Sequence, residues 1–298
     1  MNLNNILFVV ILLLMSSCAT ENPLIHANQI AQQGHLTQKF LVAGQFTLNT
    51  YSRITSPNQP IHIYIEGDGF AWVSKYQLSS DPTPKQALAL QLASLDPTEN
   101  VVYIARPCQF VDFETTTCNS AYWSDKRFSQ EVIDSMNKAV DYFSNLSNTR
   151  LSNTELSNTK LSNTKLLEIS SANIHLIGYS GGAAVAVLLT AKRCLKSCDI
   201  ASIRTVAGNL NTELLNQTHH VSSMPGSLNP INVAKQLQYM PQIHFVGADD
   251  ERVPASISTS FTAQQTGNCA AIVQIKQADH EHGWVENWVN LLKNTPKC

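Results

Sequence analysis

Short apolar runs alternate with segments of helical spacing along most of the chain. The apolar runs are rich in Ile and Val, which is typical of strands that are buried on both faces. Strands are predicted over residues 61–65, 101–105, 173–177, 203–207, 242–246 and 271–276. Helices are predicted over residues 84–95, 128–143, 183–194, 232–237, 254–262 and 285–292. Such alternation predicts an α/β protein with a mostly parallel central sheet that carries helices on both faces.

The first residues carry a different pattern. Residues 6–15 are an unbroken apolar run, too short to span a bilayer and typical of a signal peptide. The run leads into Ser16-Ser17-Cys18-Ala19, which resembles the cleavage motif of bacterial lipoproteins, where the cysteine becomes the lipid-modified first residue. The sequence therefore predicts a lipoprotein-type signal peptide over residues 1–17, lipidation of Cys18 and a polar tether over residues 18–38. The alternative is an ordinary secretory peptide cut near Ala19.

Both alternatives predict export. A lipid on Cys18 would anchor the protein to a membrane of the bacterial cell envelope, and we expect an outer membrane lipoprotein that faces the periplasm or the surface. A folded domain is predicted over residues 39–298, opening with alternating apolar and polar positions that indicate a hairpin or edge strands. A five-residue unit, Leu-Ser-Asn-Thr plus one charged residue, recurs over residues 146–165. Its period matches neither helix nor strand, so we expect a surface loop without a catalytic role.

Composition narrows the functional classes. Charged residues make up 14% of the chain and the formal net charge is -2, which gives no reason to expect a nucleic-acid partner. Six of the seven cysteines remain after Cys18, and an even number in an exported protein predicts three disulfides. Local pairing would join Cys108 to Cys118, Cys194 to Cys198 and Cys269 to Cys298, one of fifteen possible arrangements. The scattered cysteines do not resemble a metal site, and neither a metal nor an organic cofactor is expected.

The chemistry centres on the segment Gly178-Tyr179-Ser180-Gly181-Gly182. It lies between a predicted strand and a predicted helix of small residues. A serine at such a sharp turn has an exposed, rigidly held hydroxyl, as a nucleophile requires. The glycines allow strand and helix to approach closely, and the backbone N–H of Gly181 can point at a developing oxyanion. The sequence therefore predicts Ser180 as a nucleophile.

The strand, Gly-x-Ser-x-Gly turn and helix resemble the α/β-hydrolase superfamily over roughly residues 40–298. Four further segments resemble a group of poorly characterised bacterial envelope hydrolases. They are Tyr64-Ile-Glu-Gly-Asp-Gly69, Arg106-Pro-Cys-Gln109, Thr205-Val-Ala-Gly-Asn-Leu210 and Ser227-Leu-Asn-Pro230. The resemblance implies an α/β-hydrolase fold and serine-hydrolase chemistry.

The resemblance also implies an acid and a base. The segment 247–254 resembles the Gly-x-x-Asp-x-x-Val-Pro loop that carries the acid in many of these enzymes, which places the acid at Asp250, with Asp249 as the competitor. The superfamily places its histidine between the last strand and the last helix, which gives His280, with His282 as the alternative. The order serine, aspartate, histidine is that of the superfamily.

The second oxyanion donor would come from the loop after the third strand. Where many relatives carry His-Gly-x, this chain has Glu66-Gly67-Asp68, so the resemblance implies that the backbone N–H of Asp68 donates alongside that of Gly181. Carboxylates near a developing negative charge are unfavourable unless they point away or bind a cation. Arg106 is the candidate partner, although a surface role for it is equally compatible with the sequence.

These features predict a serine hydrolase that cleaves carboxylic esters through an acyl-enzyme, acting on a small-molecule or lipid ester. Residues 107–126 and 208–230 are expected to form the rim of its substrate site. An acyltransferase or a peptidase with the same three residues is an alternative. A non-catalytic envelope lipoprotein on a hydrolase scaffold is a further alternative, of a different class.

Overall fold

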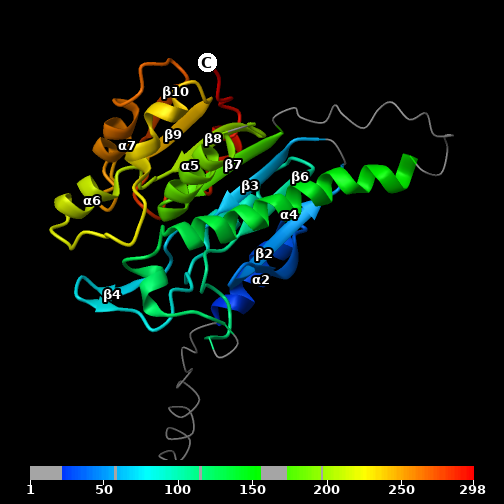
Figure 1. The fold of residues 1–298 in the computed structure, drawn as a ribbon, viewed down its shortest axis with the longest axis horizontal. Helices are drawn as coiled ribbons and strands as arrows, with labels where there is room; N and C mark the ends of the chain where they lie inside the picture. The colour runs from blue at the N-terminus through cyan, green and yellow to red at the C-terminus, as the bar shows by residue number, and fades with distance from the viewer. Residues whose placement is uncertain (1–21, 57–58, 114–115, 156–172, 196) are drawn as a thin grey trace, which may run out of the picture.

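The computed structural model describes residues 22–56, 59–113, 116–155, 173–195 and 197–298 (Figure 1). An eight-stranded sheet runs through this part of the chain in the order β1-β2-β6-β3-β7-β8-β9-β10. Strands β6, β3, β7, β8, β9 and β10 pair in parallel, whereas β2 pairs antiparallel with both β1 and β6. The strands are β1 (Thr37–Ala43), β2 (Phe46–Ile54), β3 (Ile61–Ile65), β6 (Asn100–Ile104), β7 (Ile174–Tyr179), β8 (Ile200–Val206), β9 (Gln242–Gly247) and β10 (Ala270–Ile275).

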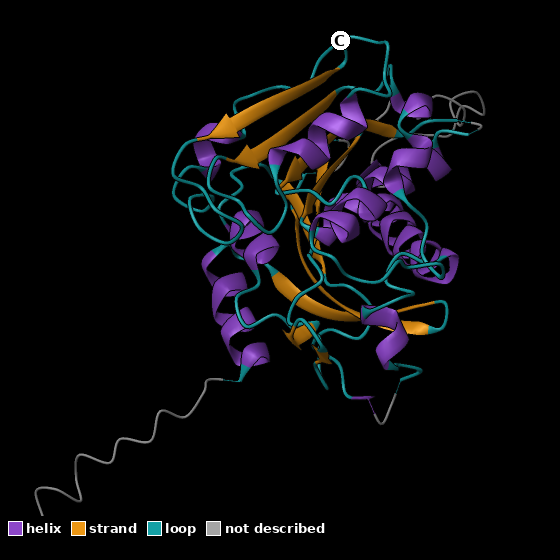
Figure 2. Ribbon diagram, turned by 90° about the vertical axis from the view of Figure 1, so that its left-hand side faces the viewer, coloured by secondary structure: helices purple, strands orange, loops and turns teal. Residues whose placement is uncertain are grey.

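Helices cover both faces of the sheet, as the alternating pattern predicts (Figure 2). Successive strand residues point to opposite faces, so in β3 the side chain of Ile63 joins one buried cluster and that of Tyr64 joins the other. The first cluster is completed by α4 (Gln130–Glu155), α5 (Gly181–Arg193) and α7 (Ala255–Thr262). The second is completed by α2 (Pro23–Gln33), α3 (Leu88–Ser94) and α8 (Trp288–Leu291).

Smaller elements fill the connections. A hairpin of β4 (Trp72–Ser74) and β5 (Gln77–Leu78) follows β3 and extends from the body of the protein (Figure 1). Its strands are too short to give a recognisable alternation, so the sequence did not predict it. Helix α6 (Thr212–Thr218) lies within residues 208–230, where no helix was predicted. The described connections also contain the 3₁₀ helices η2 (Ser120–Trp123), η3 (Pro230–Val233) and η4 (Lys235–Leu237).

The predicted polar tether is wrong for the described residues from Asn22 onward. Helix α2 begins at Pro23, with the Asn22 side chain accepting from the N–H of Leu24, and β1 begins at Thr37. The helix buries Ala27, Ile30 and Ala31, whose spacing places them on one face. This face is small and weakly apolar, which is why the segment looks polar in the sequence. Residues 1–17 and Cys18 lie outside the described residues, among which no helix is long and apolar enough to cross a membrane.

The predicted loop over residues 146–165 is also wrong in its first part. Helix α4 continues to Glu155, and Leu146 packs against the core. The five-residue unit contains neither proline nor glycine, so it does not end the helix that precedes it. Residues 156–165 lie outside the described part of the chain.

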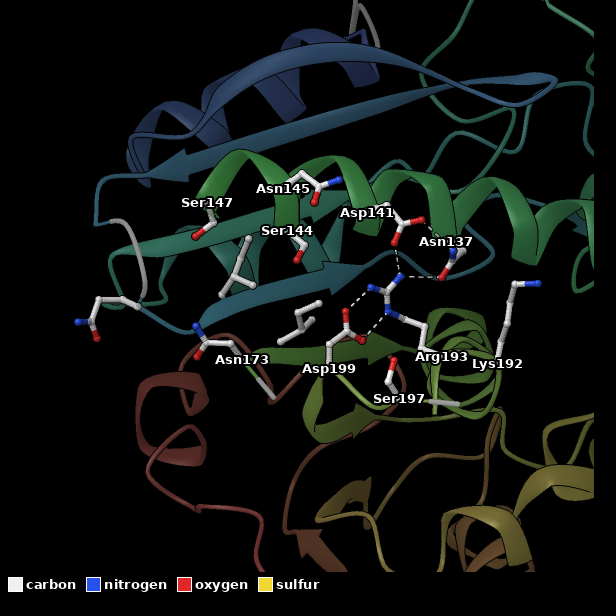
Figure 3. A pocket seen from close by; sticks show the side chains of 13 residues that line it. Asn137, Asp141, Ser144, Asn145, Ser147, Asn173, Lys192, Arg193, Ser197 and Asp199 are labelled. Carbon is white, nitrogen blue, oxygen red and sulfur yellow. Dashed lines mark hydrogen bonds and ion pairs between the residues drawn. The ribbon is translucent and has the colours of Figure 1, made fainter. Parts of the chain in front are cut away.

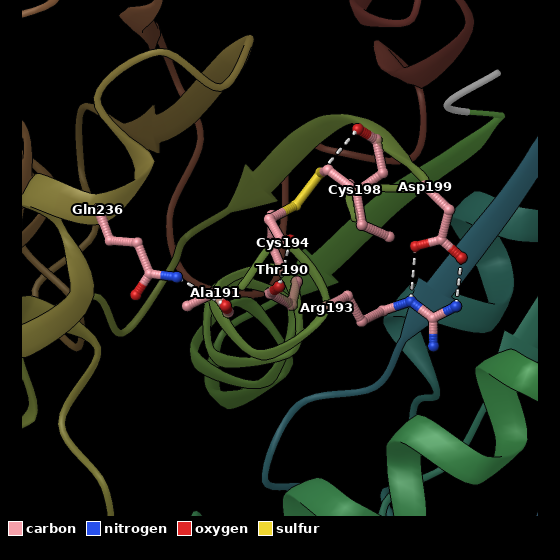
Figure 4. The surroundings of a disulfide bond; sticks show 9 residues. Thr190, Ala191, Arg193, Cys194, Cys198, Asp199 and Gln236 are labelled. Atoms are coloured by element: carbon pink, nitrogen blue, oxygen red, sulfur yellow. Dashed lines mark hydrogen bonds and ion pairs between the residues drawn. A yellow bond between two sulfur atoms is a disulfide. The ribbon is translucent and has the colours of Figure 1, made fainter. Parts of the chain in front are cut away.

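The structure confirms the expected disulfide pairing, Cys108–Cys118, Cys194–Cys198 and Cys269–Cys298. Cys194 and Cys198 join the C-terminal end of α5 to the segment before β8 (Figure 4). In the same region Arg193 binds Asp199 and Asp141 on the edge of a polar cavity of about 570 Å³ beside α4 (Figure 3). These contacts fix the end of α5 that lies farthest from Ser180.

Candidate active site

The Ser180 turn is held in a strained conformation. Strand β7 ends at Tyr179 and α5 begins at Gly181, so Ser180 alone makes the turn, at a φ of 52°. A residue with a Cβ at positive φ costs on the order of 1–3 kcal/mol, and this conformation persists only where its surroundings enforce it. Here the Ser180 N–H donates to the carbonyl of Val206, the last residue of β8, and the Ser180 carbonyl accepts from the N–H of Asn209, three residues further on. The residues that follow β8 therefore hold the strained serine in place.

The structure brings three of the predicted residues into one hydrogen-bonded chain. The Ser180 Oγ lies 3.0 Å from His280 Nε2, and His280 Nδ1 lies 3.0 Å from Asp250 Oδ2. The side chain of Asp250 is 0% exposed and that of His280 is 11% exposed. A carboxylate only accepts hydrogen bonds, so Nδ1 carries the proton of the neutral imidazole and Nε2 presents a lone pair to the serine hydroxyl.

Further hydrogen bonds hold Asp250 and His280 in position. Asp250 uses its other oxygen, Oδ1, to accept from the backbone N–H groups of Arg252 at 2.9 Å and Val253 at 2.8 Å. The backbone carbonyl of His280 accepts from the hydroxyl of Tyr179 at 3.1 Å. The Tyr179 ring also packs on the imidazole, with the ring centroids 5.4 Å apart. These contacts fix the position of the acid and the orientation of the ring.

The two alternates lie outside this chain of hydrogen bonds. The His282 side chain is 79% exposed and pairs with Asp279, whose hydrogen bond raises the pKa of His282. Asp249 is exposed, and its backbone N–H binds the carbonyl of Ala278. The geometry therefore favours Asp250 and His280 over Asp249 and His282.

The two predicted oxyanion donors lie on either side of the serine. Gly181 is the first residue of α5, so its N–H has no acceptor within the helix. The loop after β3 passes close by, since a Cβ on Gly67 would lie 3.1 Å from the Ser180 Cβ. A Cβ on Gly181 would lie only 2.0 Å from Asp68 Oδ1, so the carboxylate of Asp68 packs directly on the first turn of α5. Both backbone segments thus lie next to the nucleophile.

The Asp68 carboxylate is neutralised by two arginines. Its Oδ1 accepts from Arg106 Nη1 at 3.1 Å, which makes Arg106 the expected partner, and its Oδ2 lies 3.1 Å from Arg127 Nη1. Both guanidinium groups also lie over the ring of Phe128, at 5.1 and 5.6 Å from its centroid. Arg127 was not predicted, because it is 59 residues away from Asp68 and lies in an ordinary charged segment before α4. Two guanidinium groups around one carboxylate give this cluster of three side chains a net positive charge, close to the serine.

Glu66 is the second carboxyl group of this loop, and both of its oxygens accept hydrogen bonds from neighbouring groups. It is buried, and its Oε1 accepts from the N–H of Gly67 at 3.0 Å while its Oε2 accepts from the hydroxyl of Tyr103 at 3.1 Å. Burial raises the pKa of Glu66 to about 7. The group therefore titrates near neutral pH, where a carboxyl in water is fully ionised.

A cavity of about 940 Å³ opens over Ser180 and His280. Its apolar lining includes the side chains of Phe70, Trp72, Val73, Leu88 and Val285. Charged side chains also line it, among them Lys85, Arg252, Glu281 and Glu286. Residues 107–126 and 208–230 contribute none of the lining residues, so the expected rim is wrong. The lining comes instead from the loop after β3 together with β4, from the start of α3 and the loop before it, and from the loop that carries His280.

Among the described residues, no group of His, Cys, Asp and Glu side chains is arranged to hold a metal ion. No family model matches the chain, and no curated protein matches it.

Solved structures do resemble it. Est1E from Butyrivibrio proteoclasticus has a TM-score of 0.51 at 12% identity, over 86% of this chain and 97% of its own. An esterase from Pyrococcus furiosus has a TM-score of 0.53 at 11% identity, over 87% and 90%. An acylaminoacyl peptidase from Pyrococcus horikoshii has a TM-score of 0.55 at 12% identity, over 87% of this chain and 40% of its own. With the parallel sheet and its flanking helices, these likenesses show that the chain has the α/β-hydrolase fold.

Proposed function

We propose that this protein is a serine hydrolase that cleaves carboxylic esters through an acyl-enzyme intermediate. One observation carries the proposal, the unbroken hydrogen-bonded chain from Asp250 through His280 to Ser180 at the floor of a cavity. Retired hydrolase scaffolds usually lose one of these three groups. Their retention in bonding distance argues against a purely structural or binding role.

The first half of the reaction acylates the serine. As Ser180 Oγ attacks the ester carbonyl, its proton passes to His280 Nε2, and the resulting imidazolium is stabilised by the buried carboxylate of Asp250. The tetrahedral oxyanion accepts hydrogen bonds from the N–H groups of Gly181 and Asp68. The imidazolium then returns the proton to the leaving alcohol as the C–O bond breaks. The acyl group remains on Ser180.

The second half releases the acid. A water molecule enters from the cavity, His280 takes its proton, and the hydroxide attacks the acyl carbonyl. Collapse of this second oxyanion expels Ser180 Oγ, which recovers its proton from the imidazolium. The same two N–H donors serve both oxyanions, so their contribution enters both steps.

The cavity supports an ester with a moderately apolar acyl group. Phe70, Trp72, Val73 and Leu88 give one wall an apolar surface next to the serine. An ester of this kind is present both in small molecules and in lipids. The peptidase and acyltransferase alternatives use the same acyl-enzyme, and one structural neighbour is an acylaminoacyl peptidase.

Export belongs to the same proposal and rests on the sequence together with the disulfides. The apolar run before Cys18 supports a lipoprotein signal, and three disulfides suit an oxidising compartment outside the cytoplasm. A lipid on Cys18 would place the enzyme at a membrane of the cell envelope.

A fluorophosphonate probe tests the nucleophile. The purified wild-type protein should react with the probe, and Ser180→Ala should not. His280→Ala and His282→Ala form a matched pair, because both histidines lie in one loop but only His280 contacts the serine. Hydrolysis of a soluble p-nitrophenyl ester should be lost in the first variant and kept in the second. A folded wild-type protein that neither reacts with the probe nor hydrolyses esters would refute the proposal.

A further inference from the structure

The expected oxyanion donor of Asp68 belongs to the peptide that joins Gly67 to Asp68. A trans peptide is planar, so the N–H of Asp68 and the carbonyl of Gly67 point in opposite directions within one plane. Any group that fixes the direction of the Gly67 carbonyl therefore also fixes the direction of the Asp68 N–H. The reaction scheme assigns no residue to this task.

Gln109 holds that carbonyl. Its Nε2 donates to the Gly67 carbonyl at 3.0 Å, and its Oε1 accepts from the backbone N–H of Arg106 at 3.0 Å. The side chain is 1% exposed, so water cannot replace either bond. An amide that accepts at one end and donates at the other has a single orientation. The Gly67 carbonyl is thus held by a rigid donor.

The loop leaves room for this amide. A Cβ on Gly69 would lie 2.7 Å from Gln109 Nε2 and 2.1 Å from the carbonyl of Pro82, and Gly69 has a φ of 66°. Any other residue at Gly69 would push the loop off the amide. The second glycine of the Glu-Gly-Asp-Gly segment therefore leaves the space that the Gln109 amide fills.

The segment that carries Gln109 is itself strained. Both neighbours have positive φ, 71° at Cys108 and 58° at Phe110, where residues with a Cβ cost on the order of 1–3 kcal/mol each. The Cys108–Cys118 disulfide holds one side, and the Phe110 N–H donates to Thr83 Oγ1 at 2.8 Å on the other. Such strain persists only where the surroundings enforce it. In this strained conformation the buried amide of Gln109 faces the loop after β3.

We propose that Gln109 is a positioning residue for the oxyanion, because it aims the Asp68 N–H by binding the carbonyl on the opposite edge of the same peptide. It acts through Gly67 and does not line the cavity, so it does not touch the substrate. The arginine pair holds the Asp68 side chain while Gln109 holds the preceding peptide. This inference rests on the proposed serine-hydrolase function.

Gln109→Met tests it, with Gln242→Met as the matched control. Gln242 is also 1% exposed and also donates its Nε2 to a backbone carbonyl, that of Leu237 at 2.8 Å, but it lies at the start of β9, away from the serine. Both variants should lose stability. Only Gln109→Met should lower kcat for a soluble ester, by roughly tenfold to a hundredfold with little change in KM, because a misaimed donor weakens the transition state more than the ground state.

A trifluoromethyl ketone gives a second readout, since its adduct with the serine carries an oxyanion. Its affinity should fall by the same factor as kcat in Gln109→Met and stay constant in Gln242→Met. Gln109→Ala serves if Gln109→Met does not fold, because it removes the donor to Gly67 without placing a larger side chain in the buried site. A correctly folded Gln109 variant with wild-type kcat and inhibitor affinity would overturn the inference and leave the proposed function intact. An inactive, unlabelled wild-type protein would instead overturn the proposed function.

Discussion

Replacing Asp250 by asparagine should reverse the tautomer of His280 without moving any non-hydrogen atom. The carboxylate binds two backbone N–H groups through Oδ1 and faces His280 Nδ1 through Oδ2. An amide at this position must keep its oxygen on the two N–H groups, so its NH₂ faces the imidazole. The flipped amide would leave both N–H groups without an acceptor, at about 1–3 kcal/mol each.

The orientation preference is therefore roughly 2–6 kcal/mol, enough to make the amide donate to His280 in most molecules. Nδ1 must then accept, the proton moves to Nε2, and the imidazole can no longer take the proton of Ser180. A wrong tautomer of this kind lowers kcat by on the order of 10⁴-fold in serine proteases, and we expect a loss of similar order here. KM should change little, because the cavity is unaltered.

The assay is steady-state hydrolysis of a soluble ester by Asp250→Asn, with thermal unfolding measured in parallel. Asp249→Asn is the matched control, since it makes the same change in charge one residue away, on an exposed side chain outside the hydrogen-bonded chain. Asp249→Asn should keep wild-type kcat. A loss below tenfold in folded Asp250→Asn would refute the reasoning, and so would an equal loss in both variants.

Three further predictions concern the neighbouring groups. Because folding raises the pKa of Glu66 from 4.5 to about 7, the folded state holds the proton more tightly, and stability should fall by at most about 3 kcal/mol as pH rises across that range. Glu66→Gln should remove this loss, so the free energy of unfolding of the variant, measured in urea, should rise relative to that of wild type between pH 5 and pH 8. A difference between the two proteins that does not vary with pH would contradict the raised pKa of Glu66. Ser180→Gly should be about 1 kcal/mol more stable than Ser180→Ala, because only glycine adopts the positive φ without strain, and equal urea midpoints would argue against strain. The double variant Cys108→Ala/Cys118→Ala should lower kcat about tenfold or more, because this disulfide holds the segment that carries Gln109. Loss of the Cys269–Cys298 disulfide should lower thermal stability and leave kcat unchanged. A wild-type kcat in the first variant would show that its disulfide does not position the oxyanion loop.

Local features of this fold were predictable from the sequence. The strand, turn and helix around Ser180 follow from consecutive residues, and the strands that lead to Asp250 and His280 are short, mostly apolar segments. In a parallel sheet the loops after neighbouring strands meet at one edge. The order of the strands along the chain was therefore enough to predict that the serine, aspartate and histidine lie together. The resemblance to known loops then selected Asp250 over Asp249 and His280 over His282.

Contacts that depend on packing were not predictable. Arg127 meets Asp68, and Gln109 meets Gly67, across long stretches of sequence with no shared periodicity. The wall of the cavity was assigned to residues 107–126 and 208–230 because these connections are long. The length of a connection does not determine where it packs. Residues 107–126 pack against the loop after β3, where Gln109 binds the Gly67 carbonyl.

The position of the five-residue units has a consequence for sequence change. The chain leaves the described structure at Glu155, at the end of α4, and returns at residue 173, just before the start of β7 (Figure 1). Ser180 follows the opposite end of β7, about 20 Å away along a six-residue strand. Replication slippage in a tandem repeat adds or removes whole units, and the described chain is left at Glu155 and rejoined at the end of β7 remote from the nucleophile. Changes in the number of units after Glu155 should therefore leave turnover unchanged, and the same junction offers a place to graft a reporter domain.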